Sequence, residues 1–223
     1  MLDYGQFCSI ARAHDVLGGR WTLLVVRELL MGSRRFNDIR RGIPRISRTM
    51  LSERLQCLET AGIVTRVHGA RRPEYELTQS GQELLGLVSE LATWGQRWLP
   101  RRAVDEDLDV EPLLVDMRRR VRFEALPEHP LVIRLEVGRS EARFLLLRAS
   151  EASICTHNPG FPEPVRVNTP LAALVAWWRG DVSFAEARRI GLRVTGPRAL
   201  VRRFPEWFHR YLFVGVESAR DHR

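Results

Sequence analysis

The chain has 223 residues, of which 44% are hydrophobic and 28% charged, an ordinary composition for a globular protein with a buried core. Its 35 basic residues exceed the 27 acidic ones by 8, which suggests an anionic partner. Every basic residue is arginine, and the lack of lysine excludes P-loop nucleotide sites and Schiff-base enzymes. Arginine suits bidentate contacts to phosphate and guanine, although a GC-rich coding sequence would give the same bias.

Targeting and metal-binding signals are missing from the sequence. The longest apolar run, Leu171 to Trp178, is far shorter than the roughly 18 residues of a spanning helix, and residues 1–6 do not resemble a secretory signal. We therefore expect a cytoplasmic protein with no membrane partner. The three cysteines are far apart and form no cluster with histidine at ligand spacing, so we expect no disulfide framework, no metal site and no cofactor.

The first half of the chain predicts short helices closed by glycine. Ser9 is predicted to cap a first helix that ends at Gly18, and Trp21 to begin a second helix that ends at Gly32, with Leu24, Val25 and Leu29 on its buried face. The elements predicted after these are a helix over 36–41, a turn at 43–46, a helix capped by Ser47 that runs to Gly62, strands over 63–68 and 74–77, and a helix from Thr78 to about Arg97.

Two helices, a turn, a third helix and a hairpin with arginines at its tip give the order of a winged helix-turn-helix domain. Residues 32–72 carry ten arginines against three acidic residues, a local excess of +7. A helix fits the major groove of DNA, and a basic hairpin can reach the adjacent phosphates or the minor groove. A solvated surface would also carry such charge, but its place on this order of elements favours DNA contact.

The helix after the turn has a predicted DNA-facing side. If Leu51, Leu55 and Leu58 are buried, the opposite side carries polar residues that can read base edges, and arginines near the helix start can meet phosphates. The candidate DNA-binding residues are Arg34, Arg35, Asn37, Arg45, Ser47, Arg48, Thr49, Ser52, Gln56, Arg71 and Arg72. Glu53 on the same side either accepts from a cytosine amine or pairs with Arg54 or Arg48, and we favour the pair.

Several motifs of residues 4–99 resemble the HxlR-type transcriptional regulators. They are Cys8 to Ala13, Leu17 to Leu24, Arg35 to Ile39, Ile46 to Leu55 and Tyr75 to Thr78. The resemblance implies a homodimer whose contact is formed by the terminal helices of the domain. A two-fold dimer predicts a pseudo-palindromic operator on double-stranded DNA, with half-sites about one helical turn apart.

The same resemblance makes Cys8 a redox candidate, because some relatives sense oxidants through a cysteine near this position. Arg12, one helical turn on, and an exposed helix start would lower the pKa of the thiol. The alternative is a small buried hydrophobic residue. Cys57 and Cys155 are interpreted as core residues.

The acidic run from Asp105 to Glu111 predicts a linker over 103–111 between a domain of residues 1–102 and one of residues 112–223. The second domain predicts an α+β fold, with strands over 131–137, 142–148 and 152–156 and helices over 112–121, 170–179, 183–189 and 198–211. It resembles the sterol-carrier-protein-2-like domain, which implies a cavity for a small apolar effector. The pocket candidates are Phe144, Trp177, Trp178, Phe204 and Trp207, although their near-helical spacing favours plain core packing.

The fold predicted for the whole chain is a mainly α winged helix-turn-helix domain followed by a smaller α+β domain. Its predicted function is a sequence-specific DNA-binding transcriptional regulator, acting as a homodimeric repressor and tuned by an apolar ligand or by thiol oxidation. The alternative is a ligand-binding or interaction protein whose basic domain no longer binds DNA. No nucleophile with a base, paired carboxylates or cofactor loop supports an enzyme.

Overall fold

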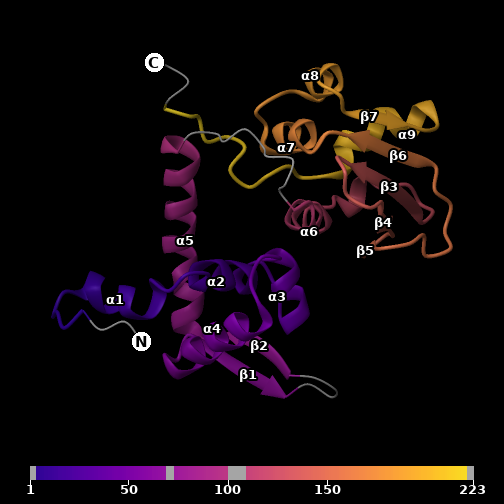
Figure 1. The fold of residues 1–223 in the computed structure, drawn as a ribbon. Coiled ribbons are helices and arrows are strands. Elements are labelled where there is room, and N and C mark those ends of the chain that lie inside the picture. Colours follow the sequence, from indigo (N-terminus) through magenta and orange to yellow (C-terminus); the bar gives the residue numbers. More distant parts are fainter. Residues whose placement is uncertain (1–3, 69–72, 100–108, 220–223) are drawn as a thin grey trace. The chain divides into compact units, whose positions relative to one another are not determined.

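The computed structural model describes residues 4–68, 73–99 and 109–219 (Figure 1). The chain divides into two compact units, residues 1–95 and 96–223. Most of the predicted linker lies outside the described residues. Of its last residues, Val110 is buried and Glu111 begins a helix of the second unit.

The first unit is a winged helix-turn-helix domain, and the predicted order of its elements is confirmed. Helices surround a small core, and a two-stranded antiparallel wing follows the fourth of them. Its elements are α1 (Ser9–Leu17), α2 (Thr22–Leu30), α3 (Phe36–Gly42), α4 (Arg48–Thr60), β1 (Val64–His68), β2 (Pro73–Leu77) and α5 (Gln79–Trp98), the last of which runs past residue 95.

The core of this unit follows the apolar periodicity of the sequence. Leu51, Leu55 and Leu58 are buried at positions i, i+4 and i+7 of α4, as predicted. They pack with buried residues from α2, α3, the turn and the wing: Val25, Val26, Leu29, Ile39, Ile43, Ile46, Val64 and Tyr75. The opposite side of α4 is therefore left to solvent.

Two predicted helix starts were wrong. Ser9 is the first residue of α1 and Cys8 precedes it, without a side-chain capping bond. Trp21 precedes α2 with a left-handed φ of +77°, so the helix begins at Thr22. Val25, Val26 and Leu29 are buried on α2, while Leu24, expected on the buried face, is exposed.

Ser47 begins α4 as predicted, since its hydroxyl accepts a hydrogen bond from the Met50 amide at 3.1 Å. Ser47→Ala removes this acceptor, and we expect it to lower the free energy of unfolding by about 1 kcal/mol. Ser52→Ala, at an exposed mid-helix position, is the matched control and should leave stability unchanged or slightly raised, because alanine favours helix. Urea denaturation measures both, and equal stability of the two variants would refute the cap's contribution.

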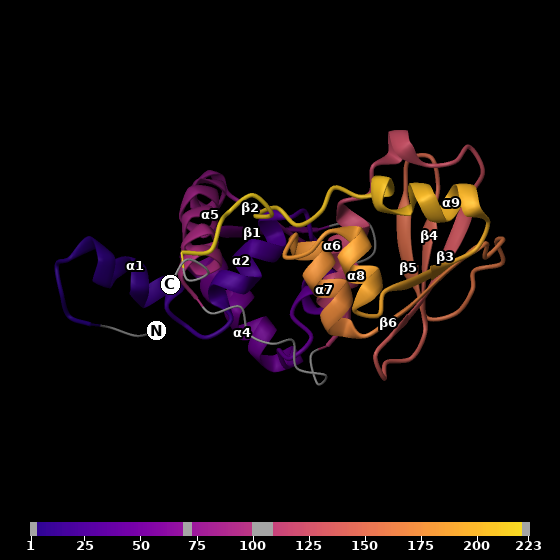
Figure 2. The same cartoon turned by 90° about the horizontal axis from the view of Figure 1, so that it is seen from above.

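The second unit is an α+β domain, as predicted. Its five-stranded mixed sheet has the order β5-β4-β3-β6-β7, in which only the β3–β6 pair is parallel. Figure 2 shows this sheet with its helices. The elements are α6 (Glu111–Arg119), η1 (Phe123–Ala125), β3 (Leu131–Val137), β4 (Arg143–Leu147), β5 (Ala152–Cys155), β6 (Val165–Thr169), α7 (Leu171–Arg179), α8 (Phe184–Arg189), β7 (Arg193–Thr195), α9 (Arg198–Arg203) and η2 (Phe204–Trp207).

The sequence did not predict β6 and β7, and it made the last helix too long. β7 has three residues, too few for a visible alternation, whereas the five residues of β6 alternate buried and exposed side chains, a signal that the prediction missed. The helix predicted over 198–211 ends as α9 at Arg203, because Pro205 cannot continue it. Phe208 is extended and forms a bridge with Val121.

The aromatic residues of the second unit pack ring against ring. Trp177 stacks on Phe204 with ring centres 5.7 Å apart, and Phe204 meets Trp207 at 5.9 Å. All three are buried, as is Trp178. Phe144 is not part of this group, because it packs in a separate cluster with Val132 and Leu146. The five pocket candidates therefore do not line one site.

Candidate nucleic-acid interface

The exposed side of α4 is the centre of the candidate interface. Thr49, Ser52 and Gln56 are all exposed there, opposite the three buried leucines. Their hydroxyl and amide groups can donate to or accept from base edges, and a helix is narrow enough to enter the major groove. Thr60 continues this side one turn beyond Gln56, and the sequence prediction missed it although the i+4 spacing marks it.

The turn before α4 fixes where this helix points. Ile43 and Ile46 are buried on either side of the half-buried Pro44, while Arg45 and Ser47 are exposed. Arg48, the first residue of α4, is exposed as well. Two guanidinium groups therefore lie at the end of the helix where DNA phosphates are usually met.

A buried carboxylate, Glu28 of α2, holds the end of α3 against α2. Arg27 pairs with it at 2.7 Å and donates a second bond to the Gly42 carbonyl at 3.1 Å. The Ser33 hydroxyl also donates to Glu28, at 3.4 Å. A side chain at position 42 would overlap the Glu28 carboxylate, so glycine is needed at this close approach. The sequence analysis missed Glu28, although an acidic residue in an otherwise apolar helix segment was a signal.

Two predicted DNA-binding arginines are paired with the wing. Arg34 pairs with Glu76, and the Arg35 Nε lies 2.9 Å from the Glu74 Oε1. The Tyr75 amide donates to the Arg34 carbonyl at 2.8 Å, so the segment before α3 runs beside β2. These partly exposed ion pairs position both arginines and leave them able to exchange carboxylate for phosphate.

The rest of the predicted site is only partly described. Asn37 is exposed on α3. Arg71 and Arg72, predicted at the tip of the wing, lie outside the described residues. Arg66 of β1 is exposed and was not among the candidates, although it belongs to the arginine-rich stretch.

The predicted pairing of Glu53 within the protein is not found. Within the described part of the chain no arginine lies within the 4.0 Å ion-pair limit of the Glu53 carboxylate. Arg54 instead directs its guanidinium toward the Met50 sulfur, at 3.4 Å from Nε and from Nη2. The exposed Glu53 thus remains free to accept from a cytosine amine.

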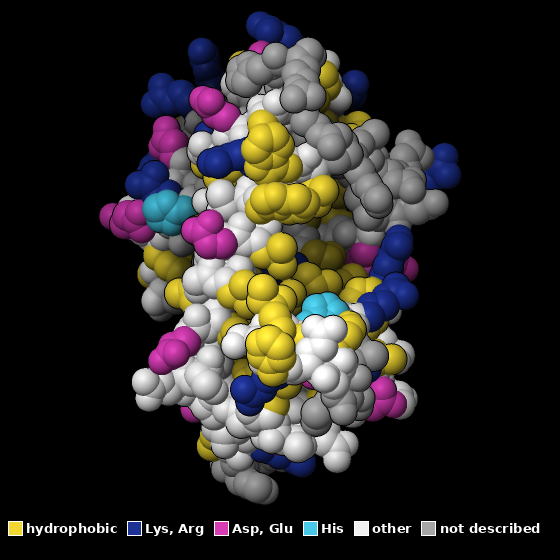
Figure 3. Space-filling model, turned by 90° about the vertical axis from the view of Figure 1, so that its left-hand side faces the viewer, with side chains coloured by type: hydrophobic (Ala, Val, Ile, Leu, Met, Phe, Trp, Pro, Cys, Tyr) yellow, Lys and Arg dark blue, Asp and Glu magenta, His cyan; other side chains and the backbone are white. Residues whose placement is uncertain are grey.

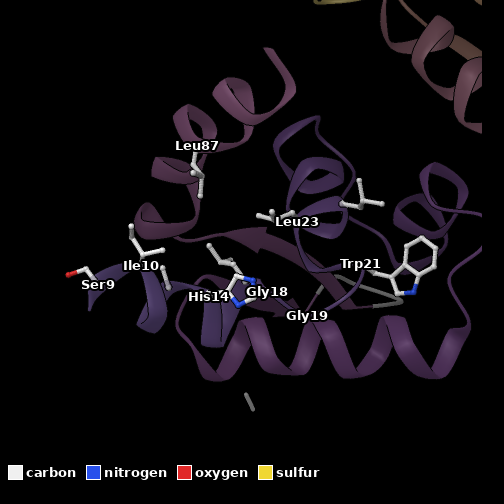
Figure 4. Close-up of a pocket in the computed structure, with 11 residues that line it drawn as sticks. Ser9, Ile10, His14, Gly18, Gly19, Trp21, Leu23 and Leu87 are labelled. Carbon is white, nitrogen blue, oxygen red and sulfur yellow. The ribbon is translucent and has the colours of Figure 1, made fainter. Parts of the chain in front are cut away.

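A separate apolar surface lies on α1 and α5 of the first unit. Leu91 is 49% and Trp94 53% exposed on α5, and Ile10 of α1 is 79% exposed. Figure 3 shows hydrophobic side chains gathered along this face. Beside it, a hollow of about 630 Å³ is lined mainly by apolar residues of α1, α2 and α5, among them Ile10 and Leu87 (Figure 4). Burying such a surface against another apolar surface would stabilise an association.

Cys8 lies immediately before α1 and is half-buried. The backbone amides of Ala11 and Ile10 donate toward its sulfur, which lowers the pKa of the thiol below its ordinary value. Cys57 was interpreted as a core residue, but it is half-buried and lines a hollow of about 560 Å³ together with Arg54 and Gln56. Cys155 is half-buried against the cluster that contains Phe144.

Among the described residues, no group of three or more histidine, cysteine or acidic side chains could hold a metal ion. No helix formed by these residues is long and apolar enough to cross a membrane.

Comparison with known proteins agrees with the winged helix-turn-helix architecture. Residues 16–103 match the model of the HxlR-like helix-turn-helix family. The HTH-type transcriptional regulator YvaP of Bacillus subtilis is 38% identical over 108 residues, which cover 47% of this chain and all of YvaP. The fold and these matches define a helix-turn-helix transcriptional regulator. The chain belongs to the HxlR-like helix-turn-helix family.

Other similar proteins also cover less than half of the chain. The HTH-type transcriptional regulator Rv3095 of Mycobacterium tuberculosis is 41% identical over 96 residues, 42% of this chain and 60% of its own length. The chain thus spans less than two thirds of that relative. The solved reduced form of the transcriptional regulator YodB from B. subtilis is 35% identical, covering 40% of this chain and 93% of YodB with a TM-score of 0.37.

Proposed function

We propose that the protein is a homodimeric, sequence-specific DNA-binding repressor that acts in the cytoplasm. The observation that carries this proposal is the division of α4 into a buried leucine side and an exposed polar side. Thr49, Ser52 and Gln56 read bases in the major groove, while Arg45 and Arg48 bind the flanking phosphates. The protein acts through binding and carries out no catalysis.

The wing and the segment before α3 supply further phosphate contacts. Arg34 and Arg35 are held beside β2 by Glu76 and Glu74, which supports a role in positioning the wing on the DNA backbone. We infer that Arg71 and Arg72, which lie outside the described residues, add two more phosphate contacts. Asn37 on the exposed side of α3 adds a polar contact.

The dimer forms through the apolar surface of α1 and α5. The exposure of Leu91 and Trp94 and the apolar hollow beside α1 support this proposal, because a second copy would remove both from water. A two-fold dimer presents its two α4 helices to half-sites about one turn of DNA apart. Occupying such a stretch excludes other proteins from it, which is the simplest route to repression.

Footprinting of the region upstream of the protein's own gene tests the proposed function. We expect two protected half-sites with pseudo-palindromic sequence, separated by one helical turn or a multiple of it. A reporter driven by that region should rise when the protein is removed. A single asymmetric half-site would contradict the dimer, and no protection at all would favour the non-DNA-binding alternative.

We propose a sterol-carrier-protein-2-like fold for the second unit, supported by its mixed five-stranded sheet and its helices. An apolar effector within the aromatic group is a weaker hypothesis, because Trp177, Phe204 and Trp207 pack against one another. It stays a prediction. Native mass spectrometry of purified protein decides it through the presence or absence of a copurifying apolar molecule.

Cys8 is proposed as an oxidant-sensitive residue. Since backbone amides lower the pKa of its thiol, more thiolate is present at neutral pH than in an ordinary cysteine. We expect Cys8 to be alkylated faster than Cys57 at pH 7, and its alkylation rate to reach its plateau at a lower pH than that of an ordinary thiol. Mild oxidant or a quinone should produce a disulfide-linked dimer or an adduct and lower operator affinity.

Two serine variants separate Cys8 from the other thiols. Cys8→Ser should abolish the oxidant response, while Cys57→Ser should keep it. Mass spectrometry after alkylation and a binding titration before and after oxidant measure the two effects. An equal response of both variants would remove Cys8 from the mechanism.

A further inference from the structure

The end of α8, β7 and α9 form a dense run of positive charge in the second unit. Residues 188–203 include six arginines and no acidic residue, which gives an excess of +6. This stretch is less than half as long as residues 32–72, whose excess is +7. All six are exposed. The five that form what we call the second basic surface are Arg188, Arg189, Arg193, Arg198 and Arg202.

These five arginines differ from the others of the same unit, many of which are paired with carboxylates. The pairs are Arg120 with Asp116, Arg134 with Glu136, Arg143 with Glu111, Arg148 with Glu151, Arg166 with Glu163 and Arg179 with Asp181, all at 2.7 to 3.4 Å. No carboxylate of a described residue lies within 4.0 Å of the second basic surface, although Arg189 is near enough to Glu186 to help lower the pKa of that carboxyl group. The sixth arginine, Arg203, is left out of this surface because it has partners of its own. Its Nε lies 3.9 Å from the Glu206 Oε2, and its guanidinium donates to the Ala125 carbonyl.

The fold keeps these side chains close together and turned outward. Three residues join α8 to β7 and two join β7 to α9, so the elements follow one another closely (Figure 1). On α9, Leu200 and Val201 pack against the core, while Arg198 and Arg202 lie one turn apart on the exposed side. On β7, Arg193 is exposed while the neighbouring Val194 is buried.

Local folding forces do not account for Arg198 on α9. Arg198 is the first residue of the helix, where the helix dipole disfavours a cation. Arg198 and Arg202 are also like charges at i and i+4, which repel each other. By contrast, Arg188, Arg189 and Arg202 lie in last turns, where the dipole favours a cation. The two costs at Arg198 are offset when an anion binds from outside.

We propose that the second basic surface binds the phosphate backbone of duplex DNA beside the site held by the winged helix. This inference rests on the proposed function and extends it to the appended unit. Planar guanidinium groups match phosphate oxygens in bidentate geometry. Because the surface is tethered to a DNA-binding domain on the same chain, even a weak phosphate contact acts at high effective concentration. The second unit thus lengthens the DNA footprint and adds affinity without reading sequence.

The test uses the full chain and two duplexes that contain the footprinted operator. One is trimmed to the two half-sites, and the other extends about one helical turn (~10 base pairs) beyond each. The variant is Arg198→Gln with Arg202→Gln, and Arg188→Gln with Arg189→Gln is an independent second variant. The control, Arg122→Gln with Arg148→Gln, removes the same charge from paired arginines of the same unit. Fluorescence anisotropy at several salt concentrations gives the affinities.

We expect the variant to bind the extended duplex about tenfold more weakly in 0.1 M salt, with a log–log salt slope reduced by about 1.8 for two lost phosphate contacts. On the trimmed duplex the variant and the wild type should bind equally, and the control should match the wild type on both.

Three results would overturn the inference. If the variant and the wild type bind the extended duplex equally, the second basic surface does not bind DNA, and the proposed function of the winged helix still stands. Loss of binding to phosphatidylglycerol vesicles in the variant, with DNA binding unchanged, assigns the surface to a membrane instead. If the wild type binds neither duplex, the proposed function itself fails and this inference fails with it.

Discussion

Replacing Trp94 by arginine is expected to give a monomer and to weaken binding to a two-half-site operator by about 100-fold or more. Trp94 is more than half exposed on α5, beside the exposed Leu91. In the proposed dimer both side chains are buried against the second copy, and an arginine there would leave a charge without a partner in an apolar contact. Analytical ultracentrifugation measures the association, and a binding titration measures the affinity.

Leu85→Arg is the matched control for this prediction. Leu85 is 57% exposed on the same helix, nine residues from Trp94, and at about 100° per residue it lies on the opposite side. It should leave the dimer and its DNA affinity unchanged. A Trp94→Arg protein that stays dimeric would show that the α5 surface is not the interface.

The double substitution Arg48→Ala with Arg72→Ala is expected to weaken DNA binding by roughly 10- to 60-fold in 0.1 M salt, because two phosphate contacts are lost. The log–log salt slope should fall by about 1.8. Arg48 is exposed at the start of α4, and alanine is a good helix former there, so the free energy of unfolding should change little. Anisotropy titrations between low and moderate salt measure both quantities.

The control for this double substitution removes two positive charges from the second unit instead. Arg122→Ala with Arg148→Ala neutralises two arginines that are paired with Glu124 and Glu151 in the second unit. This protein should bind as the wild type does. If the Arg48 and Arg72 variant also kept full affinity, the winged helix would not be the DNA-binding part of the chain.

The winged helix could be predicted from the sequence because its signals are local. Leu51, Leu55 and Leu58 repeat at helical spacing, and Ser47 supplies the capping oxygen found in the structure. Proline in the preceding turn and glycine after α4 mark where the elements stop. The exposed side of α4 followed from its buried side by geometry alone.

Features that depend on distant partners could not be predicted in this way. Arg34 pairs with Glu76, a residue 42 positions along the chain. Arg27, which pairs with the buried Glu28, also donates to the Gly42 carbonyl, 15 positions along the chain. The sequence shows that Phe144 is an apolar residue of a strand. Only the register of the strands in the sheet decides that its side chain faces away from Trp177.

The central claim is that the exposed side of α4 reads DNA sequence, and Thr49→Ala with Gln56→Ala tests it most directly. Both side chains are exposed, so the variant should fold with wild-type stability. The measurement is the ratio of affinities for the footprinted operator and a scrambled duplex of the same length and composition. We expect a ratio about 10- to 100-fold lower than that of the wild type, with affinity for the scrambled duplex unchanged. An unchanged ratio would contradict it.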